Sequence, residues 1–110
     1  MTVKIKTEVY EYLENLVTIL FEKEYFSYRE SARKYVDDLL NDIITKLPIC
    51  LKRPAPKYFN KYGKDLKYAV FRKNKNTQWY SFFSQYQDEN GNIIYLVCHI
   101  ANNHEIAHYL

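Results

Sequence analysis

The fold is decided by residues 66–100, which read LKYAVFRKNKNTQWYSFFSQYQDENGNIIYLVCHI. Three segments of this stretch are rich in the aromatic and β-branched residues that strands favour, and they cover residues 66–72, 77–86 and 93–100. Short polar turns separate them, the second around Asn90-Gly91, where a positive φ angle is tolerated. The stretch therefore predicts an antiparallel meander. Its last two strands are apolar on both faces, which predicts a central place in the sheet.

The residues before this stretch predict one short strand and two helices. Val3 and Ile5 alternate with lysines, as in a strand with one buried face. From Thr7 onward the apolar residues recur every three or four positions, which predicts an amphipathic helix. A capping box at residues 27–30 (Ser-Tyr-Arg-Glu) predicts the start of a second helix, and Pro48 ends it. Two helices joined by so few residues are expected to form an antiparallel hairpin.

Residues 48–65 connect the helices to the meander. They contain all three prolines and one of the two glycines and show no clean period, which predicts an irregular basic connector. The element order is then strand, helix, helix, connector and three antiparallel strands. This order predicts an α+β fold with two layers, and the length of 110 residues suits a single domain over residues 1–110.

Charge is concentrated in residues 52–75, which carry nine Lys or Arg and one acid, Asp65. The segment is +8 and the whole chain is +3, so the other residues sum to −5. Tyr and Phe residues are interleaved with the lysines. A basic stretch with flat rings suits a polyanion, of which nucleic acid is the commonest. The alternative is a solvated lysine-rich loop whose rings pack on the core.

Composition narrows the class of protein. Hydrophobic residues at 47% and charged residues at 26% are typical of a folded globule. The N-terminus is charged from Lys4 onward and lacks a cleavable apolar segment, and no run reaches transmembrane length. Cys50 and Cys98 are expected to be reduced thiols, and no metal-ligand spacing is present. We therefore expect a cytoplasmic protein that does not contact membranes and needs no metal or cofactor.

Several motifs resemble a known family. Residues 76–83 (NTQWYSFF) contain a T-x-W-Y-x-F-F strand, which is followed by Tyr-Leu-Val at 95–97 and Asn-Asn-His at 102–104. Together with Glu-Lys-Glu-Tyr-Phe at 22–26 and Ser-Ala-Arg-Lys-Tyr-Val-Asp at 31–37, these motifs are similar to those of RelE/ParE-like toxins. The element order also resembles the RelE/ParE superfamily, whose members are toxins of bacterial type II toxin-antitoxin (plasmid stabilisation) modules.

The resemblance implies two activities on one scaffold. One arm of the family consists of metal-independent endoribonucleases that cleave mRNA on the ribosome, and we expect this activity first. The other arm inhibits DNA gyrase without catalysis, and fold alone does not separate the two. Both arms are silenced by a cognate antitoxin, which is therefore the expected protein partner. A nucleic-acid-binding domain without toxin activity is the third alternative.

RNA cleavage without a metal needs a group that activates the 2′-hydroxyl, a cation on the phosphate and a proton for the leaving oxygen. The catalytic candidates are Arg72, His99 and His104. The nucleic-acid-binding candidates are Lys61, Lys64, Lys67, Lys73, Lys75 and Tyr80. Ribonuclease members place a basic residue on the strand that corresponds to residues 77–83, and this chain has none there. Arg72, at the end of the preceding strand, can supply that positive charge from the neighbouring strand.

Each of these residues also has a structural interpretation. His99 can be a satisfied, half-buried imidazole beside Cys98. The asparagines before His104 favour turns, so residues 102–104 can serve as a cap. Trp79 opens an apolar strand and is expected in the core rather than at a base-stacking surface.

Overall fold

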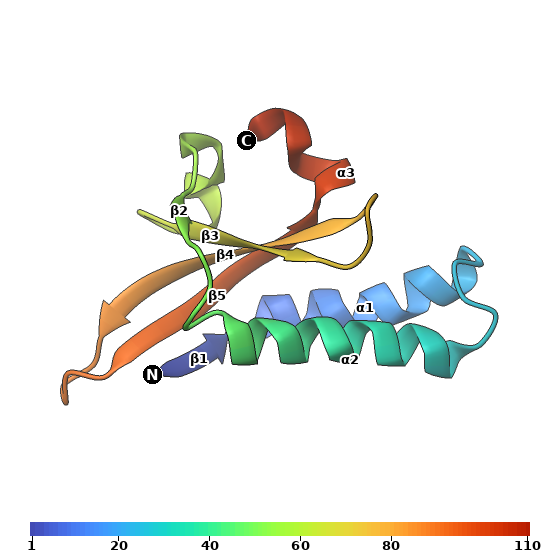
Figure 1. Cartoon of the computed structure of the whole chain (residues 1–110), viewed down its shortest axis with the longest axis horizontal. Helices are drawn as coiled ribbons and strands as arrows, with labels where there is room; N and C mark the ends of the chain where they lie inside the picture. Colours follow the sequence, from blue (N-terminus) through green and yellow to red (C-terminus); the bar gives the residue numbers. More distant parts are fainter.

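The computed structural model describes all 110 residues as a sheet that is covered on both faces (Figure 1). The elements are β1 (Thr2–Ile5), α1 (Thr7–Glu22), α2 (Arg29–Lys46), β2 (Arg53–Pro54), η1 (Lys57–Tyr62), β3 (Lys67–Arg72), β4 (Gln78–Gln87), β5 (Ile93–Asn102), α3 (Asn103–Ile106) and η2 (Ala107–Tyr109), where η denotes a 3₁₀ helix. The N-terminal strand, the two long helices and the three C-terminal strands are confirmed. None of the helices combines the length and apolarity needed to cross a membrane.

The sheet has five strands in the order β1-β5-β4-β3-β2. Strands β3, β4 and β5 form the predicted antiparallel meander, and both β4 and β5 have a strand on each side, so neither is an edge strand of the sheet. In the turn between β4 and β5, Asp88 Oδ1 accepts hydrogen bonds from the amides of Asn90 and Asn92 at 2.9 Å, and Gly91 takes a φ of 81°. Strand β1 joins the edge as a parallel neighbour of β5, so the sheet is mixed. The α+β class is confirmed.

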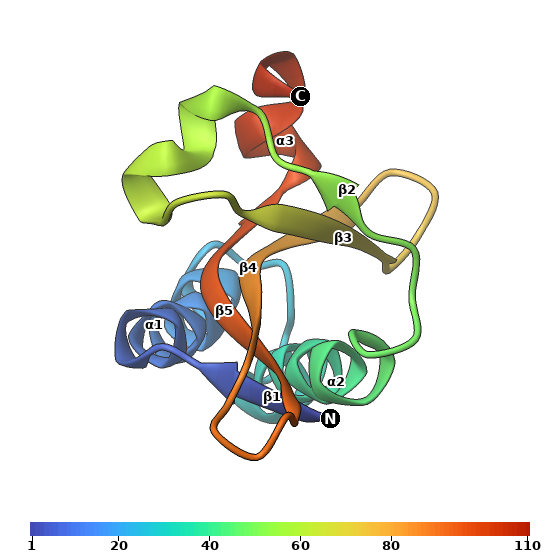
Figure 2. The ribbon, with the colours of Figure 1, turned by 90° about the vertical axis from the view of Figure 1, so that its left-hand side faces the viewer.

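Helices α1 and α2 run antiparallel and cover one face of the sheet (Figure 2). Arg33 on α2 donates both of its terminal nitrogens to Glu14 on α1 at 2.8 Å, which ties the two helices together at the surface. The core under the helices is a cluster of 16 buried residues. Trp79 belongs to it, as expected, and its Nε1 donates to Tyr35 Oη at 2.9 Å.

The opposite face of the sheet is covered by η1 and by the C-terminal segment α3–η2 (Figure 2). A second cluster of five buried residues lies here: Phe59, Leu66, Phe82, Ala101 and Ile106. Two elements therefore replace the irregular connector that the sequence predicts. Strand β2 pairs with the start of β3, and η1 is anchored by the fully buried Phe59.

The predicted capping box is wrong. Helix α2 begins at Arg29, and its N-cap is Tyr28, which makes no side-chain cap hydrogen bond. Side-chain packing holds this end of the hairpin instead. Phe26 lies 5.5 Å from Tyr35 between ring centroids, and the Arg29 guanidinium lies 5.1 Å above the Phe21 ring. These contacts fix the entry to α2 without a serine cap.

Candidate functional site

The basic-aromatic segment is organised by η1. A 3₁₀ helix has three residues per turn, so residues three apart lie one above the other. This spacing aligns Tyr58 with Lys61 on one side of η1 and Phe59 with Tyr62 on another. Phe59 is fully buried and stacks on Phe82 of β4 with 4.1 Å between ring centroids. The anchor on β4 therefore holds η1, and with it Tyr58, Lys61 and Tyr62, in place on the sheet.

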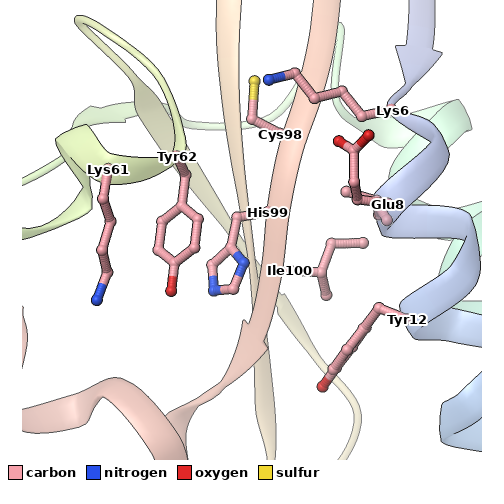
Figure 3. Close-up of a pocket in the computed structure, with 9 residues that line it drawn as sticks. Lys6, Glu8, Tyr12, Lys61, Tyr62, Cys98, His99 and Ile100 are labelled. Atoms are coloured by element: carbon pink, nitrogen blue, oxygen red, sulfur yellow. The ribbon is translucent and has the colours of Figure 1, made fainter.

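A β-bulge in β5 supplies the partner of η1. Phe82 pairs with His99 but Phe83 pairs with Val97, so Cys98 is the extra residue. The bulge breaks the strict alternation of side chains, and His99 faces η1 together with Cys98 (Figure 3). The imidazole of His99 stacks on the Tyr62 ring at 3.7 Å, with an angle of 4° between the planes. Bulges of this kind often re-aim a side chain next to a functional site.

Lys61 lies between two stacked ring pairs. Its Nζ is 4.0 Å from the Tyr58 ring centroid and 5.4 Å from that of Tyr62, and it donates a hydrogen bond to Tyr58 Oη at 2.9 Å. Tyr109, at the end of η2, stacks on Tyr58 at 3.7 Å with an interplanar angle of 6°. We call the group Tyr58, Lys61, Tyr62, His99 and Tyr109 the Lys61 site. It joins η1, β5 and the C-terminal segment.

The protonation states in the Lys61 site follow from its contacts. Burial, followed by the charge of Lys61, lowers the pKa of His99 to about 4, so the imidazole is neutral at pH 7. The hydrogen bond to Tyr58 raises the pKa of Lys61, so the ammonium keeps its charge. The same hydrogen bond lowers the pKa of the Tyr58 hydroxyl. A neutral imidazole, which can accept a proton, thus lies beside a permanent cation.

A cavity of about 300 Å³ opens in front of these groups (Figure 3). One wall carries Lys61, Tyr62 and His99, and the opposite wall is the start of α1, with Glu8 and Tyr12. Burial, followed by the nearby Glu105 carboxylate, raises the pKa of Tyr12, which is therefore protonated at neutral pH. The cavity offers a proton acceptor and a cation to one ligand, and the Tyr12 hydroxyl, which its raised pKa makes a weak acid, lies on the opposite wall.

The three catalytic candidates do not share a cavity. His99 lines the one just described, whereas the exposed His104 lines a larger one, of about 580 Å³, between the helical hairpin and the start of β4. Arg72 lines neither, and its Nε donates to the carbonyl of Asn74 at 3.3 Å in the β3–β4 turn. Asn102 caps α3 by accepting from the amide of Glu105 at 3.1 Å, so the capping interpretation of residues 102–104 is confirmed.

The nucleic-acid-binding candidates are also spread out, and only Lys61 belongs to the Lys61 site. Lys67 donates to Gln85 Oε1 at 3.3 Å, and Lys73 lies 4.0 Å from Asp42 Oδ2 beside α2. The Tyr80 hydroxyl donates to Gln78 Oε1 at 3.2 Å, and Tyr80 lines a third cavity. Lys64 and Lys75 are exposed residues next to β3, one before the strand and one after it.

Sequence reasoning missed Tyr12 and the pairing of Tyr62 with His99. Tyr12 lies in the apolar stripe of α1, so its spacing in the sequence does not distinguish it from residues of the core. The three-residue spacing in Lys-Tyr-Phe-Asn-Lys-Tyr at 57–62 is the signal that predicts a lysine above a tyrosine. No group of three or more His, Cys, Asp or Glu side chains is placed to hold a metal ion. Comparison of the chain with protein family models, with curated proteins and with solved structures finds no match.

Proposed function

We propose that the chain is the toxin of a RelE/ParE-like type II toxin-antitoxin module, and that it cleaves mRNA on the ribosome in the cytoplasm. The observation that carries this proposal is the Lys61 site, where a neutral imidazole and an ammonium group face one cavity among stacked rings. The T-x-W-Y-x-F-F motif supports it, because the first Phe of its pair, Phe82, holds the Phe59 anchor of the site. The basic segment suits both RNA and an acidic antitoxin.

The chemistry assigned to the site is transfer of the phosphate to the neighbouring 2′-oxygen. His99 accepts the proton of the 2′-hydroxyl, and the 2′-oxygen attacks phosphorus while the bond to the 5′-oxygen breaks. Lys61 stabilises the negative charge that develops on the phosphate oxygens. We assign the proton that the departing 5′-oxygen takes up to Tyr12, because Tyr12 carries the hydroxyl on the opposite wall of the cavity, although its raised pKa makes it a weak acid in the free protein. The products are a 2′,3′-cyclic phosphate and a 5′-hydroxyl, and no water or metal enters this step.

The low pKa of His99 is set in part by Lys61. A general base works best when its pKa lies near the working pH, so an imidazole with a pKa of about 4 is a weak base in the free protein. Burial is the larger cause of this low pKa and the Lys61 charge the smaller one; a phosphate bound to Lys61 cancels the smaller cause and brings a negative charge close to the ring. Substrate binding is therefore expected to raise the pKa of His99 and activate it.

Tight induction in a bacterial host tests the proposal, with incorporation of labelled amino acid and labelled thymidine followed in the same culture. We expect amino-acid incorporation to stop first and cleaved mRNA to carry 2′,3′-cyclic phosphate ends. His99→Gln should remove toxicity, whereas the matched change His104→Gln should leave it, because His104 lies outside the cavity. Full toxicity of a folded His99→Gln protein would contradict the proposed cleavage.

The separation of Arg72, His99 and His104 favours a second candidate, a toxin that inhibits DNA gyrase by binding alone. A binding surface does not need these groups in one cavity, and it tolerates an imidazole that is a weak base. In that case thymidine incorporation stops first, His99→Gln stays toxic, and the purified protein blocks supercoiling by gyrase. If neither protein synthesis nor DNA synthesis stops, the result favours the third alternative, a nucleic-acid-binding domain without toxin activity.

A further inference from the structure

A cavity of about 580 Å³ lies at the tip of the helical hairpin, between α1, the start of β4 and α3. The turns that join α1 to α2 and β3 to β4 lie at the same end of the molecule (Figure 1). We call this cavity the hairpin cavity. Its walls are mostly apolar, with a few polar groups among them. A cavity of this size and composition is typical of sites that bind small molecules.

Aromatic rings that contact one another line the hairpin cavity. Trp79 Nε1 donates to Tyr35 Oη at 2.9 Å, and the Phe26 ring lies 5.5 Å from that of Tyr35 between centroids. These contacts join β4, α2 and the turn before α2, so the wall is already formed in the free protein. Flat aromatic walls favour ligands that are themselves flat rings.

The end of α1 adds one more ring to the hairpin cavity. The amide of Tyr25 donates to the carbonyl of Leu20 at 3.0 Å, and Glu24 takes a φ of 61°, as in a Schellman motif. This motif sets Tyr25 and Leu20 together on the cavity. Tyr25 is nevertheless 70% exposed, so one face of its ring is free to stack on a ligand.

The polar groups of the hairpin cavity have unused hydrogen-bonding capacity. Glu105 carries the one carboxylate that lines the cavity, and it forms no ion pair with a lysine or arginine. The nearby Tyr12 hydroxyl uses one of the roughly four acceptor positions of this carboxylate. Asn102 Oδ1 accepts from the Glu105 amide at 3.1 Å, and Asn74 Oδ1 accepts from the Thr77 amide at 2.9 Å. Both asparagine side chains therefore keep their NH₂ groups for a ligand.

Guanine complements this arrangement of donors and acceptors. Its N1–H and 2-amino groups are adjacent donors, which can bind both oxygens of a carboxylate such as that of Glu105. Its 6-oxo group lies next to N1 and can accept from a side-chain amide such as that of Asn102, the N-cap residue of α3. Adenine, cytosine and uracil each place an acceptor beside the carboxylate, which leaves both groups unpaired.

The charges around the hairpin cavity favour an uncharged ligand. Lys23 is the one lysine or arginine that lines it, and Glu22 and Glu24 flank Lys23 in the sequence. Lys73 lies 4.0 Å from Asp42 Oδ2 and does not line the cavity. A phosphate group bound here would meet more acids than cations, so the base of a nucleoside fits better than a nucleotide or an RNA chain.

We propose that the hairpin cavity binds the guanine base of a free nucleoside, with the base among the rings and its N–H edge on Glu105. The hairpin cavity and the cavity of the Lys61 site share one lining residue, Tyr12. The inference does not rest on RNA cleavage. The variant His99→Gln, which tests cleavage, should therefore bind the nucleoside as the wild type does.

Titration of the full chain with guanosine tests the proposal. Trp79 is the only tryptophan and lines the hairpin cavity, so its fluorescence reports on binding, and NMR shifts of Tyr25 and Asn102 locate the ligand. Inosine lacks only the 2-amino group and should bind about tenfold more weakly. Uridine should not bind measurably. Guanosine 5′-monophosphate and a single-stranded RNA oligomer that contains guanine should bind this cavity no more tightly than guanosine.

Two variants test the assigned contacts. Glu105→Gln replaces one acceptor oxygen by a donor, so it should weaken guanosine by about tenfold and reduce the preference over inosine. Glu11→Gln makes the same charge change at an exposed position of α1 that lines neither cavity, and it should leave the affinity unchanged. Tyr25→Ala should weaken guanosine without a change in Tm, because the ring is exposed.

Four results would overturn the proposal. The first is an absence of guanosine binding, and the second is equal affinity for guanosine and inosine. The third is unchanged affinity in a folded Glu105→Gln protein, since the carboxylate would then not contact the base. The fourth is tighter binding of the monophosphate or of the RNA oligomer at these resonances, which would identify the ligand as a nucleotide.

Discussion

The two faces of the sheet differ in what they bury. The face under α1 and α2 buries 16 residues, and the chain supplies them at regular helical and strand periods. The face under η1 and the C-terminal segment buries five, and stacked rings and one lysine surround them. On β4 the two sets alternate, with Trp79 and Phe83 toward the helices and Phe82 toward η1. We infer that one face provides most of the stability and that the other holds the site.

The largest expected effect comes from Phe83→Ala on the helical face. Phe83 is fully buried, and removal of such a ring costs about 3–5 kcal/mol of unfolding free energy through lost burial and the cavity that remains. This loss is a large part of the stability of a small domain. Phe59→Ala is the matched change on the other face. It should cost less, near the lower end of that range, and should loosen η1 while the helical core persists.

Chemical denaturation and amide exchange together separate these outcomes. In the Phe59→Ala protein we expect faster amide exchange in η1 and α3 and loss of the Tyr62–His99 stack. The amides of α1 and α2 should keep the exchange rates that they have in the wild type. If Phe59→Ala instead unfolds the whole domain as readily as Phe83→Ala, the two faces form one cooperative core and the comparison fails.

The next effect concerns pH and His99. The pKa of His99 is about 4 in the folded protein against an ordinary value of 6.5, so between these pH values the unfolded chain binds more protons. The stabilisation is complete above pH 6.5 and is lost as the pH falls toward 4. Because the ring is only half-buried, we discount the loss to about 1–2 kcal/mol.

His99→Gln, which does not titrate, isolates this contribution. Thermal unfolding of both proteins should be followed from pH 7 to pH 4. The carboxylates whose pKa is lowered, such as Asp88, weaken both proteins alike in acid. The gap in Tm between the wild type and the variant should therefore shrink as the pH falls. A gap that is independent of pH would mean that His99 is not desolvated by η1.

The sequence predicts most elements of the helical face but not the bulge and the short strand on the side of η1, and there is a physical reason for each of these failures. Helical and strand periods predict the elements of the helical face because its side chains repeat regularly, as Leu13 and Val17 do on α1. The bulge at Cys98 has no such signature, since the residues of β5 are apolar on both sides and a one-residue slip leaves the pattern intact. The sequence does not predict strand β2, because Pro54 lacks a backbone N–H donor and proline argues against a strand. An edge strand such as β2 nevertheless tolerates a proline.

The helical face also contains a buried polar group without a hydrogen-bond partner, which the sequence does not reveal. Ser81 on β4 is fully buried between Ala69 and Ile100, and its hydroxyl has no hydrogen-bond partner. An unpaired buried hydroxyl is costly, so Ser81→Ala should raise the unfolding free energy by about 1 kcal/mol. Urea denaturation measures the change, with Ser84→Ala, farther along β4 and less buried, as the control. A fall in stability on Ser81→Ala would indicate a hidden partner for the hydroxyl.

The smallest effect on stability, and the sharpest on function, is expected for Lys61→Met. The lysine is exposed, so the unfolding free energy should change by less than about 0.5 kcal/mol. Loss of one phosphate contact should weaken binding of a single-stranded RNA oligomer and reduce the slope of log affinity against log salt by about 0.7. Lys34→Met makes the same charge change on the helical hairpin, where Lys34 pairs with Asp38 at 2.9 Å. If both variants reduce affinity and slope equally, RNA responds only to net charge, and the face that holds Lys61 has no special role in binding.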